Sequence, residues 1–144
     1  MKKILKGLFA FLFLVLLSGC AKDYKEITST KFMDTLKAEE GYLLNTHTPI
    51  YDSYIEKSIG ASGDNVQFLF FVFDSEQSAK KYVKNNYKDF SGYKYKDYGD
   101  YIEVKNTKGK YFRLIQINKT VISGSSDNKS EKKEINNIFK KLGY

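Results

Sequence analysis

The pattern of hydrophobic positions is clearest over residues 66–73, which read Val-Gln-Phe-Leu-Phe-Phe-Val-Phe. Successive side chains of a strand point to opposite faces, and here both alternating sets are apolar apart from Gln67. A strand of this kind is buried on both faces. We therefore expect a central strand at 66–73, covered on both sides, with Phe70 in the core.

Three segments carry apolar side chains at helical spacing. The first, about 30–40, follows Ser and Thr residues that can cap a helix and ends at Gly41. The second, about 75–90, follows Asp74, the expected N-cap residue, and its apolar stripe consists of Ala79, Tyr82, Val83, Tyr87 and Phe90. The third repeats Ile135, Ile138, Phe139 and Leu142 and ends at Gly143. These spacings predict two to three packed helices.

Several shorter segments are typical of strands. Residues 42–44 fit a short strand. The stretch 50–61 is ambiguous, since 50–55 are spaced for one or two helical turns and 56–61 fit a strand. An antiparallel meander is expected over 101–105, 110–117 and 120–124. The stretches 91–100 and 124–130 are rich in turn-forming residues and are expected to be loops. Hairpin-length connections cannot join parallel strands. The prediction is an α+β fold in the order α-β-α-β-α, with a largely antiparallel sheet of about five to six strands.

The first twenty residues have a different character from the rest. Lys2, Lys3 and Lys6 precede an apolar run over 8–17, which is too short to cross a bilayer as a helix. A basic start, a short apolar centre and small residues at its end are typical of a secretory signal peptide. The run closes on Leu17-Ser18-Gly19-Cys20, which matches the lipobox of bacterial lipoproteins and includes the chain's one Cys.

In this respect the chain resembles small membrane lipoproteins of Gram-positive bacteria. The resemblance implies a diacylglycerol on the Cys20 thiol and cleavage before it, so that the protein is anchored on the extracytoplasmic face of the cell membrane. It implies no catalytic residues. We expect a signal peptide at 1–19, a lipidated Cys with a short tether at 20–28 and one α+β domain at 29–144. All Lys+Arg residues of the chain except Arg113 are Lys, a bias that is typical of proteins from bacteria with low-GC genomes.

Composition narrows the function classes further. The 144 residues carry 24 Lys+Arg against 17 Asp+Glu, a net charge of +7 that falls when the three lysines of the signal peptide are removed. One Cys allows no intramolecular disulfide and no Cys-based zinc site. Nucleic acid is not an expected partner of an extracytoplasmic domain without an RNA-binding signature. His47 has no second His, and no Gly-x-Ser-x-Gly turn occurs, so we expect neither a cofactor nor a metal.

Two sets of side chains are candidate binding surfaces. Tyrosine rings offer flat amphipathic contact area at low entropic cost, and an exposed cluster would suit a ligand or a partner protein. The candidate cluster consists of Tyr93, Tyr95, Tyr98 and Tyr101. The second set lies on the polar side of the predicted 75–90 helix and could contact an anionic lipid or polymer. It consists of Lys80, Lys81, Lys84 and Lys88.

The alternative to binding is hydrolysis. Asp97, Asp100 and Glu103 lie close together in the sequence, and paired carboxylates can do general acid–base work. Their spacing does not match a calcium loop. The favoured hypothesis is a non-enzymatic, lipid-anchored domain that binds an envelope component or another envelope protein. The competing hypothesis is an envelope hydrolase that uses these three carboxylates.

Overall fold

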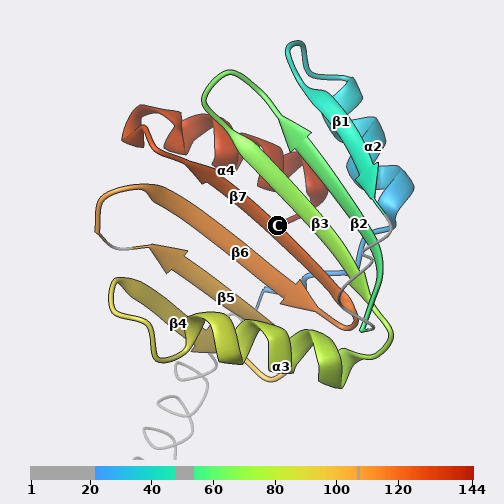
Figure 1. The fold of residues 1–144 in the computed structure, drawn as a ribbon, viewed down its shortest axis with the longest axis vertical. Coiled ribbons are helices and arrows are strands. Elements are labelled where there is room, and N and C mark those ends of the chain that lie inside the picture. Colours follow the sequence, from blue (N-terminus) through green and yellow to red (C-terminus); the bar gives the residue numbers. More distant parts are fainter. Residues whose placement is uncertain (1–21, 48–53, 107) are drawn as a thin grey trace, which may run out of the picture.

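A computed structural model of the chain describes residues 22–47, 54–106 and 108–144. Seven antiparallel strands form one sheet, and three α-helices pack on it within these ranges (Figure 1). The expected α+β class with an antiparallel sheet is confirmed, and the sheet has more strands than the five to six expected. The helices are α2 (Ser29–Lys37), α3 (Glu76–Tyr87) and α4 (Lys132–Leu142), the last preceded by a 3-10 turn, η1 (Lys129–Glu131). The strands are β1 (Leu43–His47), β2 (Ile55–Ser62), β3 (Gln67–Phe73), β4 (Tyr93–Asp97), β5 (Tyr101–Asn106), β6 (Tyr111–Ile117) and β7 (Thr120–Ser126).

The strand order in the sheet is β1-β2-β3-β7-β6-β5-β4. Two meanders, β1–β3 and β4–β7, are therefore joined by the ladder between β3 and β7, with Phe70 opposite Ile122. Helix α3 makes the crossover between them, because β3 and β4 lie far apart in the sheet (Figure 1). The other strands that follow one another in the sequence are antiparallel neighbours in the sheet.

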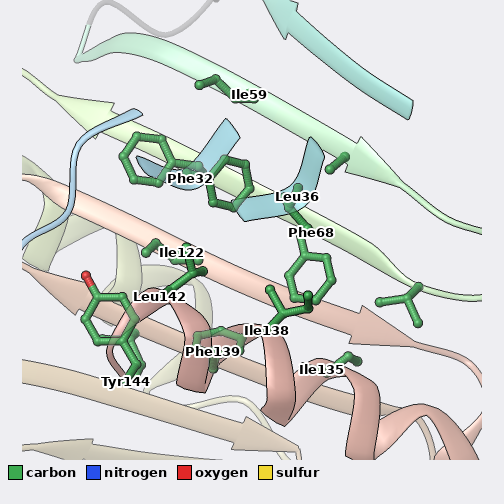
Figure 2. Packing of buried hydrophobic residues seen from close by; sticks show 14 of the residues in the cluster. Phe32, Leu36, Ile59, Phe68, Ile122, Ile135, Ile138, Phe139, Leu142 and Tyr144 are labelled. Atoms are coloured by element: carbon green, nitrogen blue, oxygen red, sulfur yellow. The ribbon is translucent and has the colours of Figure 1, made fainter. Parts of the chain in front are cut away.

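The two faces of the sheet are covered unequally. Helices α2 and α4 lie on one face, and α3 lies on the other (Figure 1). The larger core is under α2 and α4, where Phe32 stacks on Phe70 at 5.1 Å between ring centroids and Phe139 lies near Phe68 (Figure 2). The second core forms around Ala79, between α3 and strands β3, β5, β6 and β7.

The expectation that the 66–73 strand is covered on both faces is correct for the α2–α4 face and for only part of the α3 face. Phe68 and Phe70 point to the α2–α4 face and are fully buried. On the other face, Leu69 is 42% exposed because α3 crosses only the far part of that face. The strand is central, as expected, but its α3 face is partly open.

Three further boundaries differ from the sequence expectations. Residues 93–97 form the edge strand β4 rather than a loop, because alternating Tyr and Lys place the rings on the sheet and the amines in solvent. Strand β7 extends to Ser126, past the expected end at Gly124. Helix α3 begins after Ser75, whose hydroxyl accepts from the Ser78 amide at 3.2 Å, and it ends before Phe90, which is 58% exposed.

Gly124 shows why β7 tolerates a residue that weakens most strands. A Cβ at this position would lie 2.7 Å from the Phe68 ring and 2.8 Å from the Ile135 side chain. Such distances are too short for any real side chain, so glycine allows α4 to approach the sheet closely. The loop predicted at 124–130 therefore does not begin at this glycine, which lies inside β7.

The strands define two ends of the sheet. One end, called the β6–β7 end here, holds the β4–β5 turn, the β6–β7 turn at Asn118 and the last residue of β3. The opposite end, called the β2–β3 end, holds the turn at 63–66 and the first residue of β6. Helix α3 starts at the β6–β7 end and leads to the start of β4 at the β2–β3 end.

Candidate functional site

A groove of about 340 Å³ lies between α3 and the β6–β7 end of strands β2 and β3. Its position follows from the fold, because α3 leaves the sheet directly after β3 and the turn before β2 lies alongside. The Asp74 amide donates to the Tyr54 carbonyl at 2.9 Å, which fixes these two segments against each other. The lining residues are Tyr54, Phe73, Gln77, Ser78, Lys81, Tyr82, Asn85 and Asn86.

Aromatic rings form the base and one wall of the groove. Phe73 is buried at the base, and its ring lies 5.2 Å from that of Tyr82. Tyr54 is 54% exposed on the opposite side. Beyond Tyr82, the ring of Phe71 lies 5.9 Å away, and the open sheet face continues from there to Leu69. The groove thus offers aromatic surface that leads onto an uncovered part of the sheet.

Amides dominate the polar rim. Gln77, Lys81 and Asn85 lie on three successive turns of α3, with Asn86 beside Asn85. Lys81 is the one charged side chain among the described lining residues. The Asn86 amide donates to the Tyr82 carbonyl at 2.8 Å, which orients its side chain. Within the part of the chain that the structure describes, no residue hydrogen-bonds the side chains of Gln77, Lys81 or Asn85. These groups are available to a ligand.

The electrostatics of the groove do not favour acid–base chemistry. Among the residues that the structure describes, the lining holds no Asp, Glu or His. The nearby Asp74 carboxylate accepts hydrogen bonds from Ser78 and Ser75 at the start of α3, and these bonds hold its pKa below the ordinary value. Burial raises the pKa of the Tyr87 phenol, and a side-chain hydrogen bond with Tyr82 adds to the shift. The described lining therefore consists mainly of uncharged hydrogen-bonding and aromatic groups, together with the charged side chain of Lys81.

The four lysines of the expected stripe do not behave alike. Lys80 pairs with Glu76 at 2.7 Å and donates to the Gly99 carbonyl at 3.0 Å, and the hydrogen bond to Glu76 is the main cause of its raised pKa. Lys80 therefore links α3 to the β4–β5 turn. The exposed members of the set are Lys81, Lys84 and Lys88, and Lys81 lies in the groove.

The four tyrosines of the expected cluster divide between the two faces of the sheet. Tyr93 and Tyr95 are half-buried on the α3 face, where Tyr93 packs against Tyr87 at 5.3 Å. Tyr101 is buried in the α2–α4 core, and Tyr98 stacks on it at 4.6 Å. One shared binding surface of all four does not form, and only Tyr98 is largely exposed.

The three carboxylates of the hydrolase alternative do not converge. Asp97 accepts from the Gly99 amide at 2.9 Å and lies in solvent, as does Asp100. Glu103 points to the other face of the sheet, where it pairs with Arg113 at 3.2 Å and Lys105 at 2.9 Å. Glu103 is therefore held by Arg113 and Lys105 and does not join Asp97 or Asp100.

Arg113 forms a buried cluster that the sequence analysis did not single out. The guanidinium contacts Glu103 and the Asn136 side chain, and it lies 4.5 Å from the centroid of the Phe139 ring. The Tyr111 hydroxyl donates to the same Asn136 oxygen at 2.8 Å. This cluster joins β5, β6 and α4. Its one visible signal in the sequence was that Arg113 is the chain's single Arg.

A second hollow, of about 410 Å³, lies at the β2–β3 end. Asp64 and Asp127 are among its polar lining residues, and Asp127 pairs with Lys110 at 2.7 Å. No group of three or more metal-binding side chains occurs among the residues described. Within the same ranges, no helix has the length and apolar character needed to span a membrane.

Comparisons with known proteins add information on the fold. No family model matches the sequence, and no curated protein matches it significantly. Among solved structures, the chain is similar to a GTP binding regulator from Thermotoga maritima, with a TM-score of 0.53 and 13% identity. The likeness covers 81% of this chain and 84% of the other. At this identity it shows a shared fold and nothing about ligands.

Proposed function

We propose that this protein is a membrane-anchored extracytoplasmic lipoprotein whose domain binds a hydroxyl-rich envelope component, a glycan chain, without catalysing a reaction. The anchor is inferred from the lipobox at 17–20. The ligand class is inferred from the α3 groove alone. Its amides can donate to and accept from hydroxyls, and its exposed ring can stack on the apolar face of a sugar.

The observation that carries the ligand class is the combination of side chains in the groove. Neutral amides beside aromatic rings suit a neutral polyol better than a phosphate. A phosphate-binding site usually contains several cationic side chains. Lys81 can add one ionic contact if the glycan carries an acidic substituent. Glu103 is paired with Arg113 and Asp97 accepts from the Gly99 amide, and this separation supports binding over hydrolysis by these carboxylates.

The anchor is tested by Cys20→Ala in the native host. We expect the variant to lose fatty-acid labelling and to leave the membrane fraction, because two acyl chains give stable anchoring and the domain cannot replace them. The measurement is metabolic labelling with a fatty acid, together with membrane fractionation. Membrane retention of the variant, with no label on the parent, would refute the lipoprotein assignment.

The groove is tested with soluble oligosaccharides released from a Gram-positive cell wall. Each neutral hydrogen bond contributes about 0.5–1.5 kcal/mol, so replacing both Gln77 and Asn85 by Ala should weaken binding by about tenfold or more. Asn137→Ala on α4 is the matched control, since it removes an exposed amide outside the groove. Calorimetric titration gives the affinities. Equal affinities for parent and double variant would place the ligand elsewhere.

A further inference from the structure

Most of the segment expected to be a short tether is bound to the folded domain. Residues 22–28 have no regular secondary structure, yet Tyr24 and Ile27 pack against the α2–α4 core. The Tyr24 ring lies 4.8 Å from that of Tyr101 and 5.3 Å from that of Tyr144, edge-on in both cases. Docking therefore starts at Tyr24, well before α2.

Polar contacts hold the same segment at both of its ends. The Tyr24 hydroxyl lies 3.5 Å from the Arg113 guanidinium, which connects it to the buried cluster. The Asn118 amide donates to Glu26 at 3.2 Å, and Thr28 caps α2 by accepting from the Lys31 amide at 3.1 Å. These contacts tie the segment to the β6–β7 turn and to α2, so its direction relative to the sheet is set.

The chain between the acylation position and this docked segment is very short. Only Ala21, Lys22 and Asp23 separate Cys20 from Tyr24. Four steps of an extended chain reach about 14 Å at most. The headgroup layer of one leaflet is about 5–8 Å thick, as the difference between the full bilayer and its hydrocarbon core implies. A lipid on Cys20 would thus hold Tyr24 within about 10 Å of the headgroup surface.

We propose that this docked segment makes the β6–β7 end of the sheet a membrane-facing surface, which rests on the lipoprotein assignment above. In this orientation the strands stand on the bilayer, and the β4–β5 and β6–β7 turns contact the lipid headgroups. The β2–β3 end, with the turn at 63–66, points away from the membrane. Lipid headgroups are the partner of this surface.

Side chains at the β6–β7 end fit a headgroup layer. Tyr98 is 43% exposed and stacks on Tyr101, which in turn contacts Tyr24, so its phenol is held at the surface next to the docked segment. Tyrosine favours the boundary between water and lipid because its ring is apolar and its hydroxyl polar. The exposed charges at this end include both signs: Lys22, Lys25, Lys96 and Lys119 against Asp23, Glu26, Asp97 and Asp100. The contact is therefore not driven by net charge.

The test uses the full lipidated protein, reconstituted into phosphatidylcholine vesicles that contain a lipid with a nitroxide headgroup. A fluorophore is attached at Asp100→Cys or at Asp64→Cys in separate variants. Both positions are exposed aspartates in turns, one at each end of the sheet. Strands of seven residues separate these ends by more than about 20 Å, which exceeds the reach of contact quenching by the nitroxide.

We expect loss of most of the fluorescence at position 100 and little loss at position 64, with no change when salt is raised. Inserting a flexible Gly-Ser stretch of ten residues after Ala21 should remove most of the difference, because the short chain sets the orientation. Equal quenching at both positions in vesicle-bound protein would overturn the proposed orientation. Failure of the protein to carry a lipid or to stay with the vesicles would instead overturn the lipoprotein assignment.

Discussion

Phe70 and Leu69 are neighbours in β3 with opposite surroundings. Phe70 is fully buried and stacks on Phe32, whereas Leu69 lies on the open part of the α3 face. We expect Phe70→Ala to lower the free energy of unfolding by about 3–5 kcal/mol, through lost burial and the cavity left behind. The matched control Leu69→Ala should cost only about 1 kcal/mol or less. Urea titration measures both values, and similar costs for the two would contradict the assignment of the core face.

At the same scale, individual lining residues show how much of the α3 groove can be predicted from the sequence. Asn85 and Asn86 lie within the helix predicted at 75–90, and Tyr54 lies between the strands predicted at 42–44 and 56–61. They meet only because α3 folds back beside the turn that precedes β2. Helical periodicity separates an apolar side from a polar side, and it gives no information on which polar residues line a groove. The groove therefore needed the three-dimensional structure.

Among the elements, α3 presents the exposed lysines Lys81, Lys84 and Lys88 along an axis that leads away from the β6–β7 end. A bilayer at that end cannot contact all three, whereas an extended anionic polymer can. We expect their replacement by Gln to reduce binding of the domain to a teichoic-acid-type polymer by about tenfold, with loss of the parent's binding as salt rises. Lys80 is left unchanged because it pairs with Glu76.

The matched control for the lysine variant replaces three exposed lysines of α4, Lys132, Lys133 and Lys140, by Gln. It changes the net charge equally on the other face of the sheet. Surface plasmon resonance with immobilised polymer measures both variants at low and high salt. Equal loss of binding in the two variants would assign the effect to net charge, and salt-independent binding of the parent would remove the lysine contact altogether.

The elements also show where sequence patterns succeed and where they fail. The apolar stripe of α4 and the left-handed Gly143 after it were expected, and the helix ends there. Strand β4 was missed because a five-residue edge strand with lysines at alternate positions has the composition of a loop. Phe90 continued the spacing of α3, but the helix ends before it. Short edge elements and helix ends depend on neighbours that a linear pattern does not contain.

For the whole molecule, the ladder between β3 and β7 has a consequence for how the chain folds. The first meander is complete once β3 is made, whereas its partner strand β7 comes some fifty residues later. In a chain that emerges N-terminus first, β3 would appear with one edge unpaired and with Phe68 not yet covered by Phe139 of α4. Unpaired edges and uncovered aromatic side chains promote aggregation. For a chain that emerges N-terminus first, the topology thus creates an interval in which the incomplete domain depends on its surroundings to remain monomeric.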